Sequence, residues 1–262
     1  MQKISLAIPT YFSSQYLSIL LRSINKSEII NEIIISDDSN EQDEIKKIKK
    51  IIEKFQKRNK KIKIYLHENL NTNGAFNNKF EVISRCSNEI IYQIDSDNIP
   101  AKNIDKKLSK IIDNFDKEMI NYPSSLRQFF FNYQYYFYLN KNIVNLSKEN
   151  LKINSNDVSD AIINDKKITI DKNIFWILNS GNFIVSKDVY IASMEEYYDN
   201  PKVPLAADAL AISYLWLKSG KEILLNSNLH HYHRKRSDSV SLTLRDESEE
   251  SFSFFREKFK SL

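Results

Sequence analysis

The first part of the chain alternates between short apolar runs and apolar stripes at helical spacing. Residues 4–8 form an apolar run that Pro9 ends, and residues 16–24 then repeat apolar side chains at the spacing of a helix. Residues 32–36 contain three consecutive isoleucines, which is typical of a strand buried on both faces of a parallel sheet. This pattern predicts a strand, a turn, a helix and a second strand.

The alternation continues to about residue 100. We expect a helix over 43–58, a strand over 63–66, a helix over 74–84 and a strand over 89–94. Strands that alternate with helices predict an α/β fold with a largely parallel sheet. In such sheets ligands bind at the carboxyl ends of the strands, where this sequence places its polar clusters.

The second half has a weaker pattern. Residues 129–138 are the densest aromatic stretch, for which burial in a core helix is favoured over a sugar-acceptor groove or a membrane contact. Residues 140–171 look loop-rich. A regular pattern resumes over 175–185. The elements predicted after it are a helix over 188–198, a helix over 206–218, a strand over 222–225 and an amphipathic helix over 248–260.

Composition narrows the class of protein. With 262 residues, 42% of them hydrophobic, the chain can form one large α/β domain or two closely packed halves. Its net charge of +4 is too mild to indicate a nucleic-acid partner, although it suits anionic small molecules. Cys86 is the only cysteine, which leaves no disulfide framework and favours a cytoplasmic location.

Membrane association is expected to be peripheral at most. The apolar run at the N-terminus is too short for a signal peptide, and no stretch approaches the ~20 apolar residues that span a bilayer. Any membrane contact is therefore expected at the inner face.

Paired carboxylates mark the candidate site. Asp95 and Asp97 follow the strand at 89–94 with one residue between them. Like charges raise each other's pKa, and a divalent cation such as Mg²⁺ or Mn²⁺ resolves that conflict. Such a motif alone is common at solvated strand ends. Here the second strand of the same unit also ends in two carboxylates, Asp37 and Asp38, and this combination is much rarer.

With these motifs the chain resembles the inverting glycosyltransferases of family 2, over residues 4–98 and again near the C-terminus. The matching segments are Ile8-Pro9-Thr10-Tyr11, Ile34-Ile35-Ser36-Asp37-Asp38-Ser39, Glu68-Asn69-Leu70 and Gly74-Ala75-Phe76-Asn77. The resemblance implies the GT-A fold, a Rossmann-like mixed sheet flanked by helices in one compact domain. Residues 1–100 would form the nucleotide-sugar-binding half, and residues 101–262 the acceptor-binding half with a C-terminal helix.

The resemblance also implies which residues bind the donor. They are Pro9, Thr10, Tyr11, Asp37, Asp38, Asn77, Asp95 and Arg234. An aspartate can accept a hydrogen bond from the imide of uracil or the amino group of guanine, so a UDP-sugar is favoured and a GDP-sugar is the alternative. Ser39 and Asn71 stand where the family usually has glycine, and asparagine still tolerates left-handed backbone conformations.

Asp208 is the candidate catalytic base, because in this family an aspartate near the start of a helix lines the acceptor site. The family more often has Glu-Asp here, whereas this chain has Ala207 before Asp208. An aspartate at this position is also a good helix cap. The upstream segment 179–183 resembles the strand that precedes the base in the family and favours the catalytic interpretation.

Residues 229–236 concentrate three of the four histidines and three cationic residues. The resemblance implies that His233 completes a metal shell with Asp95 and Asp97 and that Arg234 binds the diphosphate, with His231 as the reserve ligand. A solvated basic tail and a zinc site of two histidines and a carboxylate are the alternatives. His67 is interpreted as structural.

The predicted function is metal-dependent transfer of a sugar from a nucleotide diphosphate sugar to an acceptor hydroxyl, in bacterial glycan or polysaccharide synthesis. The acceptor is expected to be a glycan or a lipid-linked glycan. A non-catalytic GT-A-like nucleotide-binding or interaction module remains an alternative because of Ser39, Asn71 and Ala207. A nucleotidyltransferase is disfavoured, since residues 8–14 contain no glycine to cradle a triphosphate.

Overall fold

The computed structural model describes residues 2–129, 143–165, 174–198, 207–234 and 245–262. The strands are β1 (Ile4–Thr10), β2 (Ile30–Asp37), β3 (Lys63–Glu68), β4 (Ile90–Gln93), β5 (Ile99–Pro100), β6 (Met119–Phe129), β7 (Ile143–Asn145), β8 (Leu151–Ile153), β9 (Phe183–Ser186) and β10 (Glu222–Arg234). The helices are α1 (Ser14–Ile24), α2 (Gln42–Arg58), α3 (Gly74–Ser84), α4 (Ile104–Ile112), α5 (Ser155–Ile163), α6 (Phe175–Leu178), α7 (Lys187–Met194), α8 (Asp208–Lys218) and α10 (Arg245–Lys260), with a 3₁₀ turn over Glu195–Tyr197.

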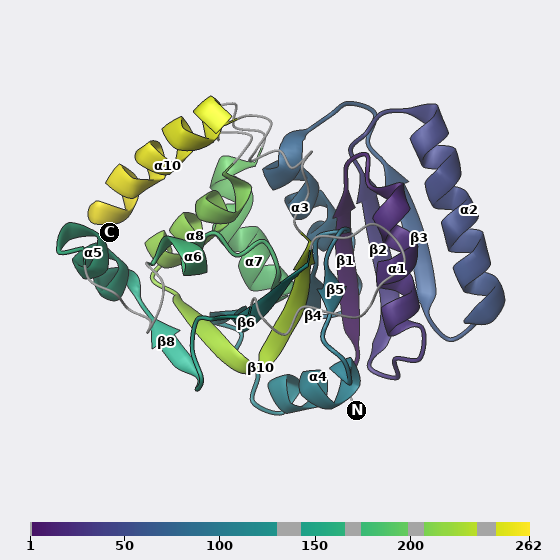
Figure 1. The fold of residues 1–262 in the computed structure, drawn as a ribbon, viewed down its shortest axis with the longest axis horizontal. Helices are drawn as coiled ribbons and strands as arrows, with labels where there is room; N and C mark the ends of the chain where they lie inside the picture. The colour runs from purple at the N-terminus through teal and green to yellow at the C-terminus, as the bar shows by residue number, and fades with distance from the viewer. Residues whose placement is uncertain (1, 130–142, 166–173, 199–206, 235–244) are drawn as a thin grey trace.

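These strands form one mixed sheet with helices on both faces (Figure 1). Its order is β3-β2-β1-β4-β9-β6-β10-β5, while β7 pairs with β6 and β8 pairs with β10. The first four strands in this order run parallel, β9 lies antiparallel between β4 and β6, and β10 runs parallel to β6. The carboxyl ends of β1, β2, β4, β6 and β10 therefore share one edge.

The alternation of side chains along β2 explains its three isoleucines. Ile33 and Ile35 belong to the hydrophobic cluster that includes residues of α1, α2 and α4, whereas Ile34 belongs to the cluster on the opposite face with residues of α3, α7 and α8. All three are buried. Because helices cover both faces of this strand, it carries no polar face.

The C-terminal helix α10 lies against α5 and α8, at the end of the molecule away from α2 (Figure 1). Phe255 and Phe259 are fully buried and Phe252 packs against the same cluster. The predicted apolar face of this helix is thus confirmed. Among the described residues, no helix combines the length and apolar character needed to cross a membrane.

The sequence prediction was wrong for part of the second half. Residues 140–171 contain β7, β8 and α5 rather than loops alone. Helix α5 begins at a capping box in which Asn154 accepts from the backbone of Asp157 and the Asp157 side chain accepts in return. The aromatic stretch 129–138 lies outside the described residues, except that Phe129 ends β6.

Candidate active site

The parallel register brings the polar ends of the first strands together. Thr10 pairs with Asp37 across β1 and β2, and Asp37 pairs with Glu68 across β2 and β3. Asp95 follows the end of β4, which neighbours β1. The expectation that these polar clusters meet at one edge of the sheet is confirmed.

Asp37 links the first two loops. Thr10 donates to its Oδ1 at 2.7 Å, and Ser39 donates to the same oxygen at 3.0 Å. Its Oδ2 is buried without a hydrogen-bond partner among the described residues. Burial raises the pKa of Asp37, although these hydrogen bonds act in the opposite direction. The carboxylate fixes the loop geometry and keeps one oxygen without a donor.

Asp38 holds the start of α3. Its Oδ1 accepts from the side chain of Asn69 at 3.0 Å and from the backbone of Asn73 at 2.8 Å, and its Oδ2 accepts from the backbone of Gly74 at 2.9 Å. Gly74 has a φ of 82°, a left-handed conformation that glycine adopts without strain. Burial raises the pKa of Asp38. Both carboxylate oxygens of Asp38 therefore accept hydrogen bonds from within the protein.

Two aromatic rings stand exposed after β1. Tyr11 and Phe12 are 48% and 45% exposed, and their rings meet edge to face at 4.9 Å. Phe12 has a φ of 45° and donates its backbone amide to Ser39 Oγ at 2.8 Å. Pro9 lies within β1, and Asn77 is half-buried on the first turn of α3. The exposed rings offer flat apolar surface beside the Asp37 loop.

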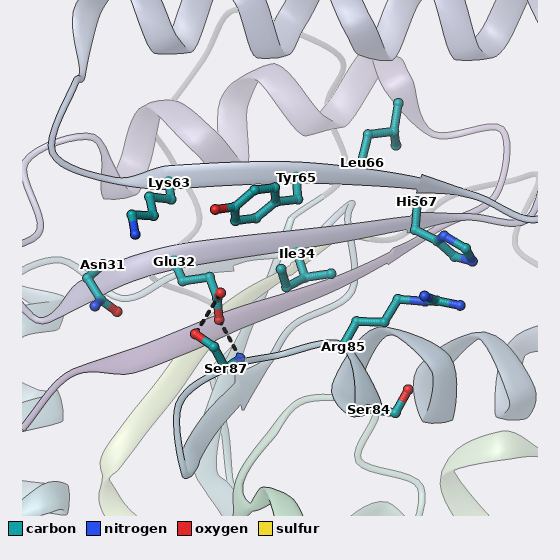
Figure 2. Close-up of a pocket in the computed structure, with 10 residues that line it drawn as sticks. All are labelled: Asn31, Glu32, Ile34, Lys63, Tyr65, Leu66, His67, Ser84, Arg85 and Ser87. Atoms are coloured by element: carbon teal, nitrogen blue, oxygen red, sulfur yellow. Dashed lines mark hydrogen bonds between the residues drawn. The ribbon is translucent and has the colours of Figure 1, made fainter.

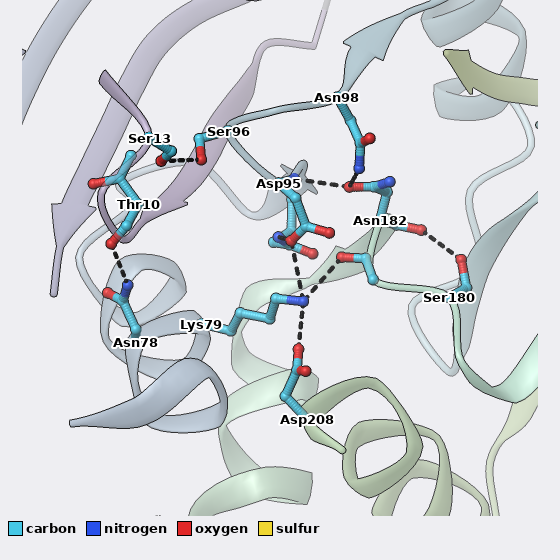
Figure 3. A network of polar contacts seen from close by, with 12 residues as sticks. Thr10, Ser13, Asn78, Lys79, Asp95, Ser96, Asn98, Ser180, Asn182 and Asp208 are labelled. Atoms are coloured by element: carbon cyan, nitrogen blue, oxygen red, sulfur yellow. Dashed lines mark hydrogen bonds and ion pairs between the residues drawn. The ribbon is translucent and has the colours of Figure 1, made fainter. Parts of the chain in front are cut away.

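The Asp95-Ser96-Asp97 segment forms a turn that residues from both halves of the chain hold in place. The backbone of Asn98 donates to the Asp95 carbonyl at 3.0 Å and closes the turn. The backbone of Asp95 donates to Asn182 Oδ1 at 2.7 Å, while Ser96 Oγ lies 2.6 Å from Ser13 Oγ. Ser13, which follows β1, and Asn182, which precedes β9, therefore both hold this turn (Figure 3).

A buried lysine joins the two candidate carboxylates. Nζ of Lys79 lies 3.1 Å from Asp95 Oδ1, 2.6 Å from Asp208 Oδ2 and 3.3 Å from the carbonyl oxygen of Gly181 (Figure 3). Burial alone would lower the pKa of Lys79, but the carboxylates of Asp208 and Asp95 raise it above its ordinary value. Lys79 is therefore a charged ammonium group between the carboxylates of Asp95 and Asp208.

Gly181 allows this approach because it has no side chain. A Cβ at this position would lie 2.5 Å from Asp95 Oδ2 and 3.2 Å from Lys79 Nζ. The first distance is far below van der Waals contact, so any other residue would displace the carboxylate. The absence of a side chain at Gly181 thus lets its backbone pack directly against Asp95 and Lys79.

The end of β10 reaches the same turn. Nε2 of His231 lies 2.9 Å from Nδ2 of Asn182, and burial lowers the pKa of His231 to about 3. Asn182 Oδ1 already accepts from the Asp95 backbone, so Nδ2 is the donor and His231 Nε2 the acceptor. This bond occupies Nε2 and leaves Nδ1, which is buried without a hydrogen-bond partner among the described residues, as the nitrogen through which His231 could bind a metal ion. His233 is half-buried, with its ring 5.9 Å from that of His231.

Arg234 also contacts the turn. Its Nε donates to the Asp97 carbonyl at 3.2 Å, and its backbone donates to Asn98 Oδ1 at 3.2 Å. The guanidinium lies 4.5 Å from the ring centroid of Tyr16. Arg234 therefore lies against the backbone of the Asp95-Ser96-Asp97 turn, and its binding of a diphosphate stays a prediction.

The candidate metal ligands are not a closed site. Within the described residues, no three side chains of His, Cys, Asp or Glu converge as a metal site, so Asp95, Asp97 and His233 do not form a ready-made shell. Magnesium and manganese commonly take one or two protein carboxylates and complete their shell with water and substrate phosphates. The two carboxylates of this turn fit that arrangement.

A hollow of about 850 Å³ lies elsewhere, along β2 and β3 beside the end of α3 (Figure 2). Its lining includes Glu32, Lys63, His67 and Arg85 but none of the predicted site residues. Glu32 accepts from the backbone and side chain of Ser87, both at 2.8 Å. This hollow is separate from the candidate active site.

Sequence reasoning missed Lys79, Gly181 and Asn182 as site residues. Lys79 had a visible signal, because it lies three residues after Phe76 and one before Phe80, on the buried side of a predicted helix. A lysine at such a position requires a buried counter-charge. In the sequence, the segment 179–183 indicates only a likeness to the strand that precedes the base in the family.

Comparison with known proteins places this arrangement in a family. Residues 5–173, more than half of the chain, match the model of glycosyl transferase family 2. The chain therefore belongs to glycosyl transferase family 2. A comparison with curated proteins found no match.

Solved glycosyltransferases share the fold. TarS 1-349 of S. aureus in complex with UDP matches with a TM-score of 0.60 at 16% identity, over 98% of this chain and 65% of that chain. The same protein in complex with UDP-GlcNAc matches with a TM-score of 0.58 at 18% identity, over 91% of this chain and 60% of that chain. GalNAc-T7 with UDP, GalNAc and Mn²⁺ matches with a TM-score of 0.59 at 14% identity, over 97% of this chain and 50% of that chain. The chain thus spans less than two thirds of these solved chains, and the predicted GT-A fold is confirmed.

Proposed function

We propose that the protein transfers a sugar from a UDP-sugar to an acceptor hydroxyl. The observation that carries this proposal is the meeting of Asp95, at the donor edge of the sheet, and Asp208, at the start of α8, on one Lys79 ammonium. Family membership supports the same reaction class. A site that only bound a nucleotide would have no need to bring a second carboxylate from α8 to this edge.

The donor nucleoside would bind over the loops after β1 and β2. Tyr11 offers an exposed ring on which a base can stack, and Thr10 and Asp37 lie beside it. Asp38 would act by fixing the loop, with Pro9 and Asn77 shaping its borders. UDP is favoured over GDP because TarS and GalNAc-T7, which share the fold, are solved with UDP.

The diphosphate would lie against the Asp95-Ser96-Asp97 turn. Asp95 and Asp97 would hold Mn²⁺ or Mg²⁺, with His233 as a further ligand, and the bound cation would neutralise the diphosphate charge. Arg234 beside Asp97 supplies a permanent positive charge for the same group. Lys79 neutralises part of the carboxylate charge at Asp95.

Asp208 would be the general base. Its side chain is 19% exposed, so an acceptor can reach it, and Lys79 keeps Oδ2 in place at 2.6 Å. The carboxylate takes the proton of the acceptor hydroxyl, the oxygen bonds to the anomeric carbon, and the bond from that carbon to the diphosphate oxygen breaks. Displacement in line would invert the anomeric configuration. We propose a glycan or lipid-linked glycan acceptor, in bacterial glycan synthesis at the inner face of the membrane.

Release of nucleotide diphosphate tests the proposal. We expect the protein with Mn²⁺ to release UDP from at least one of UDP-GlcNAc, UDP-GalNAc and UDP-glucose, and to act less on GDP-mannose. A non-catalytic module would bind UDP in calorimetry without releasing it from any donor. Pyrophosphate release from UTP and a sugar phosphate would indicate a nucleotidyltransferase instead.

A further inference from the structure

We infer that Lys79 is a positioning residue of the transfer reaction, which holds the donor-side Asp95 and the acceptor-side Asp208 at a fixed separation. The inference rests on the proposed function and extends it to a residue on α3. It concerns how the two halves of the site are joined.

The first support is the cost of burying this charge. The Lys79 side chain is only 5% exposed, and an unpaired ammonium group there would be strongly unfavourable. Its contacts at 2.6 Å and 3.1 Å are to Asp208 and Asp95, and a carbonyl oxygen accepts its third bond. All three donor directions of the ammonium group are therefore used.

The second support is the origin of the partners. Lys79 comes from α3, Asp95 from the turn after β4, and Asp208 from the first residue of α8. Helix α3 packs on β1 and β2 and also contacts α7 and α8. One side chain thus connects the nucleotide-binding strands with the helix that carries the candidate base.

The third support is the space left by Gly181. A Cβ there would lie 2.5 Å from Asp95 Oδ2 and 3.2 Å from Lys79 Nζ. The backbone thus leaves no room for a side chain where the lysine and the carboxylate meet. Gly181→Ala would displace this pair without removing a charge, which separates geometry from electrostatics.

Three variants test the inference through UDP-GlcNAc hydrolysis with Mn²⁺, measured per folded protein. We expect Lys79→Met to lower kcat by about 100-fold, because a misplaced reacting group costs about this factor. Lys79→Arg should recover part of that loss, and Gly181→Ala should lower kcat with all charges present. Lys187→Met is the control, since the Lys187 ammonium group donates to the Cys86 carbonyl at 2.7 Å, outside the candidate site. It should keep parental kcat.

A double variant excludes a merely structural role. Residues that act as a unit are not additive, so Lys79→Met with Asp208→Asn should lose little more kcat than Asp208→Asn alone. Parental kcat in both Lys79→Met and Gly181→Ala, beside an active parent, would overturn the Lys79 assignment alone. Should Lys79→Met fail to fold, Gly181→Ala decides the matter. A parent protein that hydrolyses no donor would overturn the proposed function and this assignment together.

Discussion

Asn182 donates its side-chain amide to Nε2 of His231 at 2.9 Å, and this contact ties the end of β10 to the candidate metal turn. The oxygen of the same amide accepts from the Asp95 backbone at 2.7 Å and from Asn98 Nδ2 at 3.4 Å. Because Asn182 is buried, water cannot replace these partners. The turn that carries the paired carboxylates is therefore held by residues far away in sequence.

Asn182→Leu should loosen this turn. Removal of a buried amide leaves its partners unsatisfied, which costs about 1–3 kcal/mol. We expect a loss of that size in the free energy of unfolding, measured in urea, together with weaker binding of UDP in the presence of Mn²⁺. Asn179→Ala is the control because its side chain is exposed. Unchanged UDP affinity in Asn182→Leu would show that the turn does not need this amide.

His231 predicts a pH dependence of stability. Its pKa is lowered from 6.5 to about 3 in the fold, so between these values the unfolded chain binds a proton that the folded chain does not. The contribution of the neutral His231 ring to the free energy of unfolding is complete above pH 6.5 and is lost as the pH falls toward 3. The slope is about 1.4 kcal/mol per pH unit for one proton.

The measurement is the difference in unfolding free energy between the parent and His231→Gln, in metal-free buffer from pH 7 to pH 4. Asp37 and Asp38 titrate in both proteins and cancel in this difference. The parent should lose its advantage as the solution is acidified. A difference that does not change with pH would mean that His231 is not buried as a neutral ring.

Asp38→Ala should destabilise the fold more than it affects the chemistry. Its carboxylate caps α3 through Asn73 and Gly74, and loss of a cap costs about 1–2 kcal/mol. The comparison is Asp43→Ala in urea unfolding, since Asp43 forms an exposed ion pair with Lys46 at 3.1 Å. Equal stability of the two variants would argue against this capping role.

Asp97→Ala should abolish Mn²⁺-dependent donor binding and leave the fold intact. The carboxylate is half-buried at a strand end and contributes little to the core. Titration calorimetry with UDP, with and without Mn²⁺, measures the effect, and His233→Ala should weaken binding less because water can replace one ligand. Equal affinities for UDP in Asp97→Ala and the parent would exclude the metal site. If zinc instead copurifies with the parent and is lost in His233→Ala, the residues form a zinc site.

Local patterns predicted most of the first hundred residues. The predicted helix 74–84 agrees with α3 at both ends, because the left-handed Gly74 starts it and an apolar stripe continues to residue 83. The alternation of strands and helices sufficed for the fold class. These features depend on neighbouring residues, which a sequence displays directly.

Long-range contacts limited the prediction elsewhere. The strand predicted over 222–225 runs on to Arg234 as β10, although polar residues interrupt its pattern. Asn226 donates to Asn121 Oδ1 at 2.9 Å, at a point where the register with β6 shifts. Such a polar pair between strands cannot be foreseen from either segment. The contacts of Lys79 with Asp95 and Asp208 were hidden for the same reason.

The most direct test of the proposed reaction compares Asp208→Asn with the parent protein. Asparagine keeps the size of the side chain and caps a helix about as well, but it cannot take the proton of the attacking hydroxyl, which in donor hydrolysis belongs to water. We expect UDP release from UDP-GlcNAc, with Mn²⁺, to fall by roughly 10²–10⁴ while the Kd for UDP in calorimetry barely changes. Near-parental release by Asp208→Asn would contradict this account and leave Asp208 only a helix cap.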